Sequence, residues 1–222
     1  MKILAADTAL GACSVAILDD EKLLAHRFAA MARGHAEAIA PMVDDAIHES
    51  GLTFGALDRL AVTTGPGTFT GQRVGLAFMR GLRVALKRPL IGVTTLEAMC
   101  AAAMAEARTP YAAAIHDARR GEAYLSVTSA FATLLPPSLV ILDEAPAKIR
   151  ALIHGDAPVA LAGTAAESVA DTIGIATYVT SVGQPDALFV ARLARHAPET
   201  SDAPRPLYLR APDAKLPAAA RS

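Results

Sequence analysis

The chain is organised around residues 65–75, which read GPGTFTGQRVG. The apolar run at 60–62 before this stretch predicts a strand, and residues 76–87 after it predict a helix. Glycines and a proline at this density predict a tight, irregular turn, in which Thr68 and Thr70 can cap the helix. Such a strand-to-helix turn presents backbone N–H groups at the positive end of a helix dipole. It is therefore either an anion cradle or a turn that only packs closely.

Known phosphate motifs do not fit this spacing. A P-loop ends in Gly-Lys-Ser or Gly-Lys-Thr, and the stretch has no such ending. The dinucleotide fingerprint would put a glycine where Thr70 stands. Spacing alone therefore favours close packing, and a nucleotide or phosphate contact stays an alternative. Its candidate residues come from the end of the first predicted strand and from the turn: Asp7, Thr8, Gly65, Gly67, Thr68, Thr70 and Gly71.

Composition limits the class of protein. Of the 222 residues, 53% are hydrophobic and 19% are charged, which allows a sizeable core and argues against disorder. A net charge of −1 disfavours a free-standing nucleic-acid binder. Cys13 and Cys100 are far apart, which suits a reducing compartment and offers no metal-binding spacing. The sequence shows neither a signal-peptide pattern nor an apolar run of membrane-spanning length, so we expect a cytoplasmic protein without membrane contact.

Local patterns in the first half predict three strands joined by short turns, and then alternating helices and strands. Short turns between consecutive strands indicate an antiparallel meander, and the later crossovers favour parallel pairing. This order is typical of a ribonuclease-H-like or actin-like lobe. The predicted strands are 3–7, 12–18, 23–30, 60–62 and 89–93, and the predicted helices are 35–50, 76–87 and 94–107.

The second half restarts this pattern in a reduced form. Its predicted strands are 111–116, 122–129, 139–142 and 158–162, and its predicted helices are 145–154, 164–171 and 186–196. Prolines from Pro198 onward predict an extended tail. We therefore predict an α/β fold of the actin-like ATPase class (ASKHA, ribonuclease-H-like), with two lobes of mixed sheets flanked by helices. The predicted boundaries are 1–107 for the N-terminal lobe, 108–200 for the smaller C-terminal lobe and 201–222 for the tail.

Several stretches stand in the order that one family shows. They are residues 3–9 (ILAADTA), 65–71 (GPGTFTG), 91–96 (IGVTTL), 117–124 (DARRGEAY) and 206–210 (PLYLR). Over nearly its full length the chain resembles the bacterial TsaB family, also called YeaZ. The resemblance implies a non-catalytic scaffold or activator that binds the paralogous subunit TsaD. Together they would serve the transfer of threonylcarbamoyl from threonylcarbamoyl-AMP to N6 of adenosine 37 in tRNA.

The resemblance also implies what this chain lacks. The metal motif of TsaD reads GVNHLEGH, and the matching residues 92–99 read GVTTLEAM here. Thr95 and Met99 replace both histidines, and these side chains cannot supply two imidazoles to one metal ion. We therefore expect no metal site and no enzyme activity of the chain alone. It would be a subunit of a tRNA N6-threonylcarbamoyladenosine transferase complex.

Partners follow from the same resemblance. We expect a heterodimer with TsaD, TsaE as the ATPase of the larger complex, a homodimer when the chain is alone, and indirect contact with tRNA. No cofactor is required, although ATP or ADP at the shared interface stays open. In the family the first two helices make the interface, and Gly75 inside one of them would admit either a partner helix or the chain's own lobe. The candidate interface residues are His35, Ile39, Met42, Val43, Ile47, Arg73, Gly75 and Arg80.

Other classes of protein stay as alternatives. A small actin-like phosphotransferase or another ATP-binding enzyme would need an intact phosphate hairpin, and residues 7–11 read DTALG, which is eroded. Asp7 could contact a hydrated magnesium ion, but an aspartate that caps its own turn is the favoured interpretation. A metallopeptidase would need the two missing histidines. A regulatory module with other clients is compatible with the same sequence.

Overall fold

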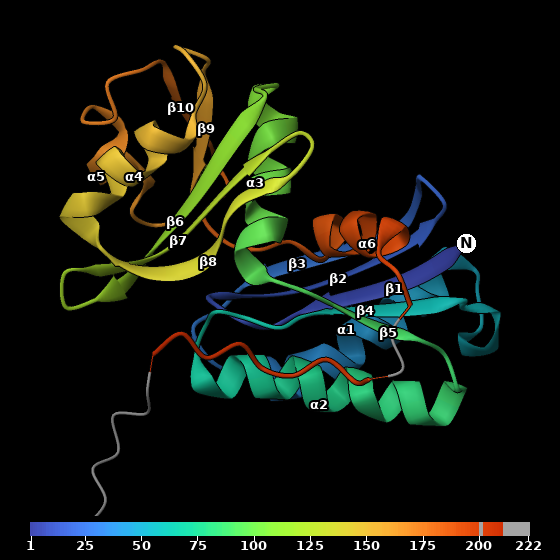
Figure 1. Ribbon diagram of the computed structural model, residues 1–222. Helices are drawn as coiled ribbons and strands as arrows, with labels where there is room; N and C mark the ends of the chain where they lie inside the picture. Colours follow the sequence, from blue (N-terminus) through green and yellow to red (C-terminus); the bar gives the residue numbers. More distant parts are fainter. Residues whose placement is uncertain (200–201, 211–222) are drawn as a thin grey trace, which may run out of the picture.

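The computed structural model describes residues 1–199 and 202–210. It contains two five-stranded sheets, with strand orders β3-β2-β1-β4-β5 and β10-β9-β6-β7-β8 (Figure 1). In each sheet the first three strands pair antiparallel and the next two join parallel, so the second sheet repeats the arrangement of the first. This duplication, with helices flanking both sheets, confirms the predicted fold class.

The elements have the following bounds. The first sheet is built from β1 (Lys2–Asp7), β2 (Ala12–Asp19), β3 (Lys22–Ala30), β4 (Arg59–Thr63) and β5 (Leu90–Val93). The second sheet is built from β6 (Tyr111–Arg119), β7 (Glu122–Ser129), β8 (Thr133–Ile141), β9 (Val159–Ala162) and β10 (Thr177–Val179). The α-helices are α1 (His35–Ser50), α2 (Phe69–Leu86), α3 (Thr95–Ala107), α4 (Ala145–Leu152), α5 (Ala166–Ala170) and α6 (Ala187–His196), and two short 3-10 turns span Phe54–Ala56 and Leu142–Glu144.

Helices cover both faces of the first sheet (Figure 1). On one face, α1 and α2 share a core with strand residues such as Leu4 and Leu60. On the other face, α6 packs on residues such as Ile3 and Ala61. The predicted boundaries placed α6 in the C-terminal lobe, and the structure corrects this, because the buried face of α6 belongs to the core of the first sheet.

The helix α3 joins the two halves. It leaves β5 of the first sheet, and Leu96, Met99 and Cys100 pack against the β6 residues Ala112 and Ala114. Its opposite side contributes Ala98 to the core beneath α6. None of the helices within the described ranges is both long and apolar enough to cross a membrane.

Three elements differ from the prediction, each for a local reason. The helix α2 begins at Phe69 instead of residue 76, so the glycine-rich stretch itself forms its first turns. The strand β8 runs over 133–141 despite Pro136 and Pro137, because it is an edge strand and needs fewer backbone donors. The strand β10 was not predicted, because it has three residues and lies at the other edge of its sheet.

Candidate functional site

The glycine-rich turn connects β4 with α2 and docks onto the turn between β1 and β2. Thr68 is the N-cap of α2, and its Oγ1 accepts a hydrogen bond from the N–H of Gly71 at 3.0 Å. The N–H of Thr68 donates to the carbonyl of Ala9 at 2.8 Å. The hydroxyl of Thr8 donates to the carbonyl of Gly71 at 2.7 Å. The two turns therefore form one hydrogen-bonded junction.

This junction explains the glycines. A Cβ on Gly67 would lie within 3.0 Å of the Ala9 carbonyl oxygen, and one on Gly71 equally close to the Thr8 carbonyl oxygen, a separation that real Cβ atoms essentially never show. A Cβ on Gly75 would lie 2.6 Å from Thr8 Oγ1. Backbone carbonyls and threonine hydroxyls of the chain itself therefore fill the space beside these glycines. Of the predicted phosphate contacts, Gly65 is also buried, whereas Thr68 and Thr70 stay exposed at the start of α2.

Asp7 ends β1 and is fully buried. Its Oδ1 accepts hydrogen bonds from the Thr63 hydroxyl at 2.5 Å and from the Ala9 N–H at 3.1 Å, while Oδ2 has no hydrogen-bond partner among the described residues. Burial raises the pKa of Asp7 to about 7, although both hydrogen bonds act in the opposite direction. The bond from the Ala9 N–H is the turn-capping contact that the sequence favoured for Asp7.

Most of the predicted interface residues belong to the core of the first sheet. Ile39, Val43 and Ile47 are at most 7% exposed. His35 is also buried, and its Nε2 forms a hydrogen bond with the Leu10 carbonyl at 3.0 Å. Together with Gly75, these residues are corrected from surface contacts to internal ones. Helical periodicity identifies the apolar face of a helix, and here that face packs on the chain's own sheet.

Other residues form the outer face of α1 and α2. The helix α2 exposes Ala77, Gly81 and Val84, the last of which is 73% exposed. Among the described residues, no atom outside the backbone of α2 lies within 4 Å of a Cβ built on Gly81. The helix α1 exposes Ala40 and Pro41 next to three carboxylates. These carboxylates are Glu37, Asp44 and Asp45. The outer face of the two helices therefore carries small apolar residues, and a second helix could pack closely against such a face. Met42 is half-buried between this face and the core.

Residues 202–210, which we call the strap, run along α2 (Figure 1). Arg80 donates to the Pro204 carbonyl through Nε at 3.1 Å and also through Nη2. Arg73 donates through Nε to the Tyr208 hydroxyl at 2.8 Å. Both arginines were predicted to contact a partner, and both hold the chain's own C-terminal segment instead. In the sequence, the PLYLR stretch marked this segment as a family feature, but it did not predict where the segment docks. Residues 211–222 of the predicted tail lie outside the described residues.

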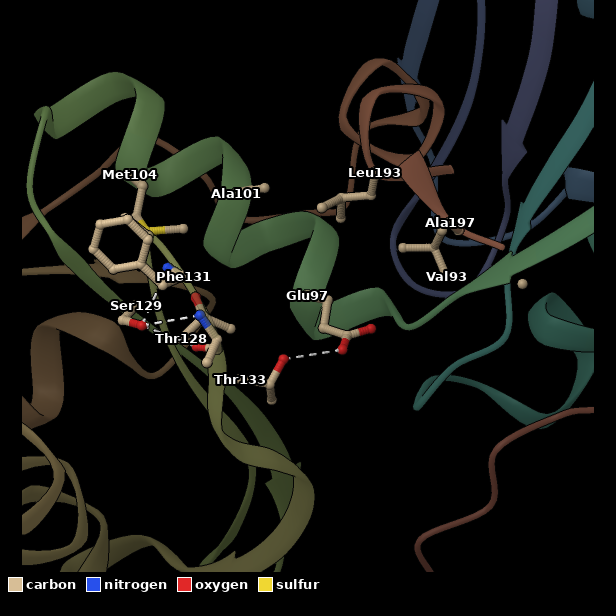
Figure 2. A pocket seen from close by; sticks show the side chains of 13 residues that line it. Val93, Glu97, Ala101, Met104, Thr128, Ser129, Phe131, Thr133, Leu193 and Ala197 are labelled. Carbon is tan, nitrogen blue, oxygen red and sulfur yellow. Dashed lines mark hydrogen bonds between the residues drawn. The ribbon is translucent and has the colours of Figure 1, made fainter. Parts of the chain in front are cut away.

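A cavity of about 340 Å³ opens between α3, α6 and the turn that joins β7 with β8 (Figure 2). Figure 2 shows Glu97 at one side of this cavity and Phe131 at the tip of the turn. The Thr133 hydroxyl donates to Glu97 Oε1 at 3.4 Å. Side chains such as Met104 and Leu193 make the walls largely apolar. No motif in the sequence indicated this cavity.

The residues that correspond to the metal motif serve α3. Thr94 and Glu97 form a capping box, in which Thr94 Oγ1 accepts from the Glu97 N–H at 3.2 Å and Glu97 Oε2 accepts from the Thr94 N–H at 3.3 Å. Thr95 and Met99 are fully buried. In the part of the chain that the structure describes, no group of three His, Cys, Asp or Glu side chains is placed to hold a metal ion.

Comparisons with known proteins agree with this geometry. The family model TsaD, described as tRNA N6-adenosine threonylcarbamoyltransferase, matches residues 24–202. The tRNA threonylcarbamoyladenosine biosynthesis protein TsaB of Escherichia coli (strain K12) is 42% identical over 124 residues, which are 56% of this chain and 53% of that protein. The chain thus spans about half the length of the curated relatives it matches.

Solved structures extend the likeness to nearly the whole chain. The structure of YeaZ from Pseudomonas aeruginosa superposes with a TM-score of 0.78 and 30% identity, covering 94% of this chain and 99% of that one. A more distant likeness is component A of the (R)-2-hydroxyglutaryl-CoA dehydratase of Acidaminococcus fermentans, which superposes with a TM-score of 0.54 over 87% of this chain and 97% of that one. At 10% identity, this likeness shows a shared fold alone. The chain therefore belongs to the family that the TsaD model describes, and within it to the TsaB (YeaZ) proteins.

Proposed function

We propose that this chain is a non-catalytic scaffold or activator subunit in the biosynthesis of threonylcarbamoyladenosine in tRNA. It binds TsaD, and the complex transfers threonylcarbamoyl from threonylcarbamoyl-AMP to N6 of adenosine 37. The membership in the TsaB family supports the pathway. The burial of Thr95 and Met99 in the core of α3 supports a subunit that leaves metal chemistry to its partner.

The docking surface for TsaD is the outer face of α1 and α2. The single observation that carries this assignment is the exposed row Ala77, Gly81 and Val84, at a spacing that puts all three on one side of α2. Gly81 costs about 1 kcal/mol in a helix relative to alanine, and among the described residues a Cβ built on it meets no atom outside its own helix, so we infer that its small size serves a partner. A partner helix can then pack at short range along α2.

The distribution of charged side chains on α1 and α2 favours one orientation of a partner on this face. The exposed carboxylates of α1 lie beside α2, whose cations include Arg80, Arg83 and Lys87. A twofold axis between two copies would place the acidic α1 of one on the basic α2 of the other. The chain alone therefore forms a homodimer through the surface that TsaD takes in the complex.

No nucleotide is required at the glycine-rich turn, because Thr8 and Ala9 fill the space beside its glycines. This filling also counts against the phosphotransferase alternative. ATP or ADP, where the complex needs it, sits at the interface with TsaD, and TsaE serves as the ATPase. We place the complex in the cytoplasm, where its tRNA substrate is.

The test is a variant of the exposed row. Val84→Arg should weaken binding to TsaD by more than tenfold in calorimetry and lower the yield of a reconstituted modification assay in parallel. Val179→Arg, on the edge strand β10 of the second sheet, is the matched control, because Val179 is 44% exposed and lies away from both helices. Unchanged TsaD affinity and unchanged product with Val84→Arg would show that the docking surface is elsewhere. Product that forms equally well without this chain would reject the activator role.

A further inference from the structure

The strap connects the start of α2 with a hairpin of the second sheet. At one end, the rings of Phe69 and Tyr208 stack with centroids 5.8 Å apart and planes 26° from parallel, and the guanidinium of Arg73 lies 3.6 Å over the Phe69 ring. At the other end, Arg210 donates to the Ala118 carbonyl at 2.8 Å and pairs with Glu122, at the turn between β6 and β7. Segments far apart in sequence thus form one continuous surface.

This surface is rich in cations and in exposed aromatic rings. Phe69 is 56% exposed and Tyr208 is 45% exposed, although each is fixed by its neighbours. The turn between β6 and β7 adds the exposed Arg119 and Arg120. The surface contains five arginines, namely Arg73, Arg119, Arg120, Arg205 and Arg210, against the three carboxylates Asp117, Glu122 and Asp202. It is locally positive in a chain whose net charge is −1.

We propose that Phe69, Arg73, Arg119, Arg120, Tyr208 and Arg210 form a contact site for an unpaired segment of RNA. Proteins recognise unpaired RNA by stacking bases on aromatic rings and guanidinium planes, while arginines bind the phosphates. The Phe69–Arg73–Tyr208 cluster supplies the stacking platform, and the arginines of the β6–β7 turn lie where the backbone of the same RNA continues. The inference rests on the proposed function, in which the substrate is a tRNA, and it replaces indirect contact with tRNA by direct contact.

An acidic peptide fits this surface less well. Peptides bind through a groove for an amphipathic helix, through a free strand edge or, when acidic, through an arginine cluster, and an arginine cluster alone would make no use of the exposed rings of Phe69 and Tyr208. Here the N–H of Leu207 donates to the Thr64 carbonyl at 2.8 Å, so the strap itself takes the backbone acceptor next to β4. Pro204 covers Gly92 of the edge strand β5 in the same way. The rings of Phe69 and Tyr208 and the side chains of Arg119 and Arg120 remain exposed to solvent, which suits bases and phosphates.

The experiment measures tRNA affinity by fluorescence anisotropy for the full chain, alone at low salt and in complex with TsaD. Tyr208→Ala should weaken tRNA binding about 5- to 100-fold, while Tyr208→Phe, which keeps the ring, should leave it nearly unchanged. The double variant Arg119→Asn with Arg120→Asn should weaken it about 25-fold near 0.1 M salt and reduce the slope of log K against log salt by about 1.4. Asparagine suits these positions because both residues have positive φ, 65° and 60°.

The control variants distinguish a loss of RNA binding from a change in charge elsewhere and from a loss of folding. Arg119→Lys with Arg120→Lys keeps both charges and should retain most of the affinity. Lys22→Ala removes an exposed cation on β3, at the edge of the first sheet opposite the strap-covered β5, and should change nothing. Thermal unfolding checks that each variant is folded.

Two results would overturn the RNA assignment. The first is tRNA affinity within twofold of the unmodified chain for both the Tyr208→Ala and the double asparagine variants. The second is a loss of TsaD binding that accounts for the whole loss of tRNA binding, which would make the surface a protein interface. A chain that binds no TsaD at all would reject the proposed function, and the measurement on the chain alone would still decide the RNA site.

Discussion

The junction between the glycine-rich turn and the β1–β2 turn makes a quantitative prediction for Gly71→Ala. The added Cβ would lie within 3.0 Å of the Thr8 carbonyl oxygen, so one backbone must move. That movement breaks the buried bonds from Thr8 Oγ1 to Gly71 and from the Thr68 N–H to Ala9. Each lost bond costs about 1 kcal/mol, and overpacking adds about 1–3 kcal/mol. We expect the free energy of unfolding to fall by about 3–5 kcal/mol.

The assay is urea and thermal unfolding followed by circular dichroism. For a chain of this length, a loss of this size lowers the melting temperature by about 10 °C. Gly81→Ala is the matched control, because Gly81 lies in the same helix with nothing near its Cβ, and it should raise stability by about 1 kcal/mol. If Gly71→Ala and Gly81→Ala change stability by the same small amount, the turn is not a packed junction, and its glycines would have to be explained by a ligand.

Three further predictions concern buried or capping side chains. Burial raises the pKa of Asp7 from about 3.8 to about 7, so the folded chain binds more protons than the unfolded chain between these values. Its free energy of unfolding should therefore fall as pH rises through this window. Asp7→Asn should flatten that fall in urea unfolding at about pH 5 and about pH 7.5, and an unchanged slope would assign the fall to other groups. Glu97→Ala removes the capping box of α3 and should lower the free energy of unfolding by about 1 kcal/mol, measured by thermal unfolding, without changing tRNA modification. A variant that keeps full stability but loses modification would instead show that Glu97 has a direct role. Arg59 is 7% exposed and donates to the Ala194 carbonyl at 2.6 Å, so Arg59→Met should cost about 2–3 kcal/mol by the same assay, and a loss below about 0.5 kcal/mol would contradict this anchoring of α6.

The candidate site shows where sequence reasoning stops. The spacing of Ile39, Val43 and Ile47 correctly predicted the apolar face of α1, but it could not say what covers that face. The chain's own sheet covers it. The exposed row proposed for a partner consists of Ala77, Gly81 and Val84, and small residues such as the first two give no periodic apolar signal. A contact surface of this kind, if partners approach it through their backbones, is therefore hard to predict from one sequence.

The strap is the other feature that local patterns could not place. Its prolines predicted an absence of helix and strand, and residues 202–210 have neither. They did not predict that Arg73 and Arg80 would hold this segment along α2, because those contacts join residues more than 120 positions apart. The cavity beside Glu97 has the same origin, since β5, α3, α6 and the turn between β7 and β8 line it together.

The sequence by itself determined the order of the strands and helices except for β10, the glycine-rich turn and the cap at Thr68. These features depend on neighbouring residues, through alternation, helical periodicity and turn chemistry. The tertiary structure alone decided that Thr8 and Ala9 fill the glycine-rich turn, that α6 returns to the first sheet, and which side of α2 stays open. Those outcomes depend on contacts between segments that are far apart in the sequence. Every apolar surface of the chain competes for the same buried positions, so no single segment decides which surface is covered.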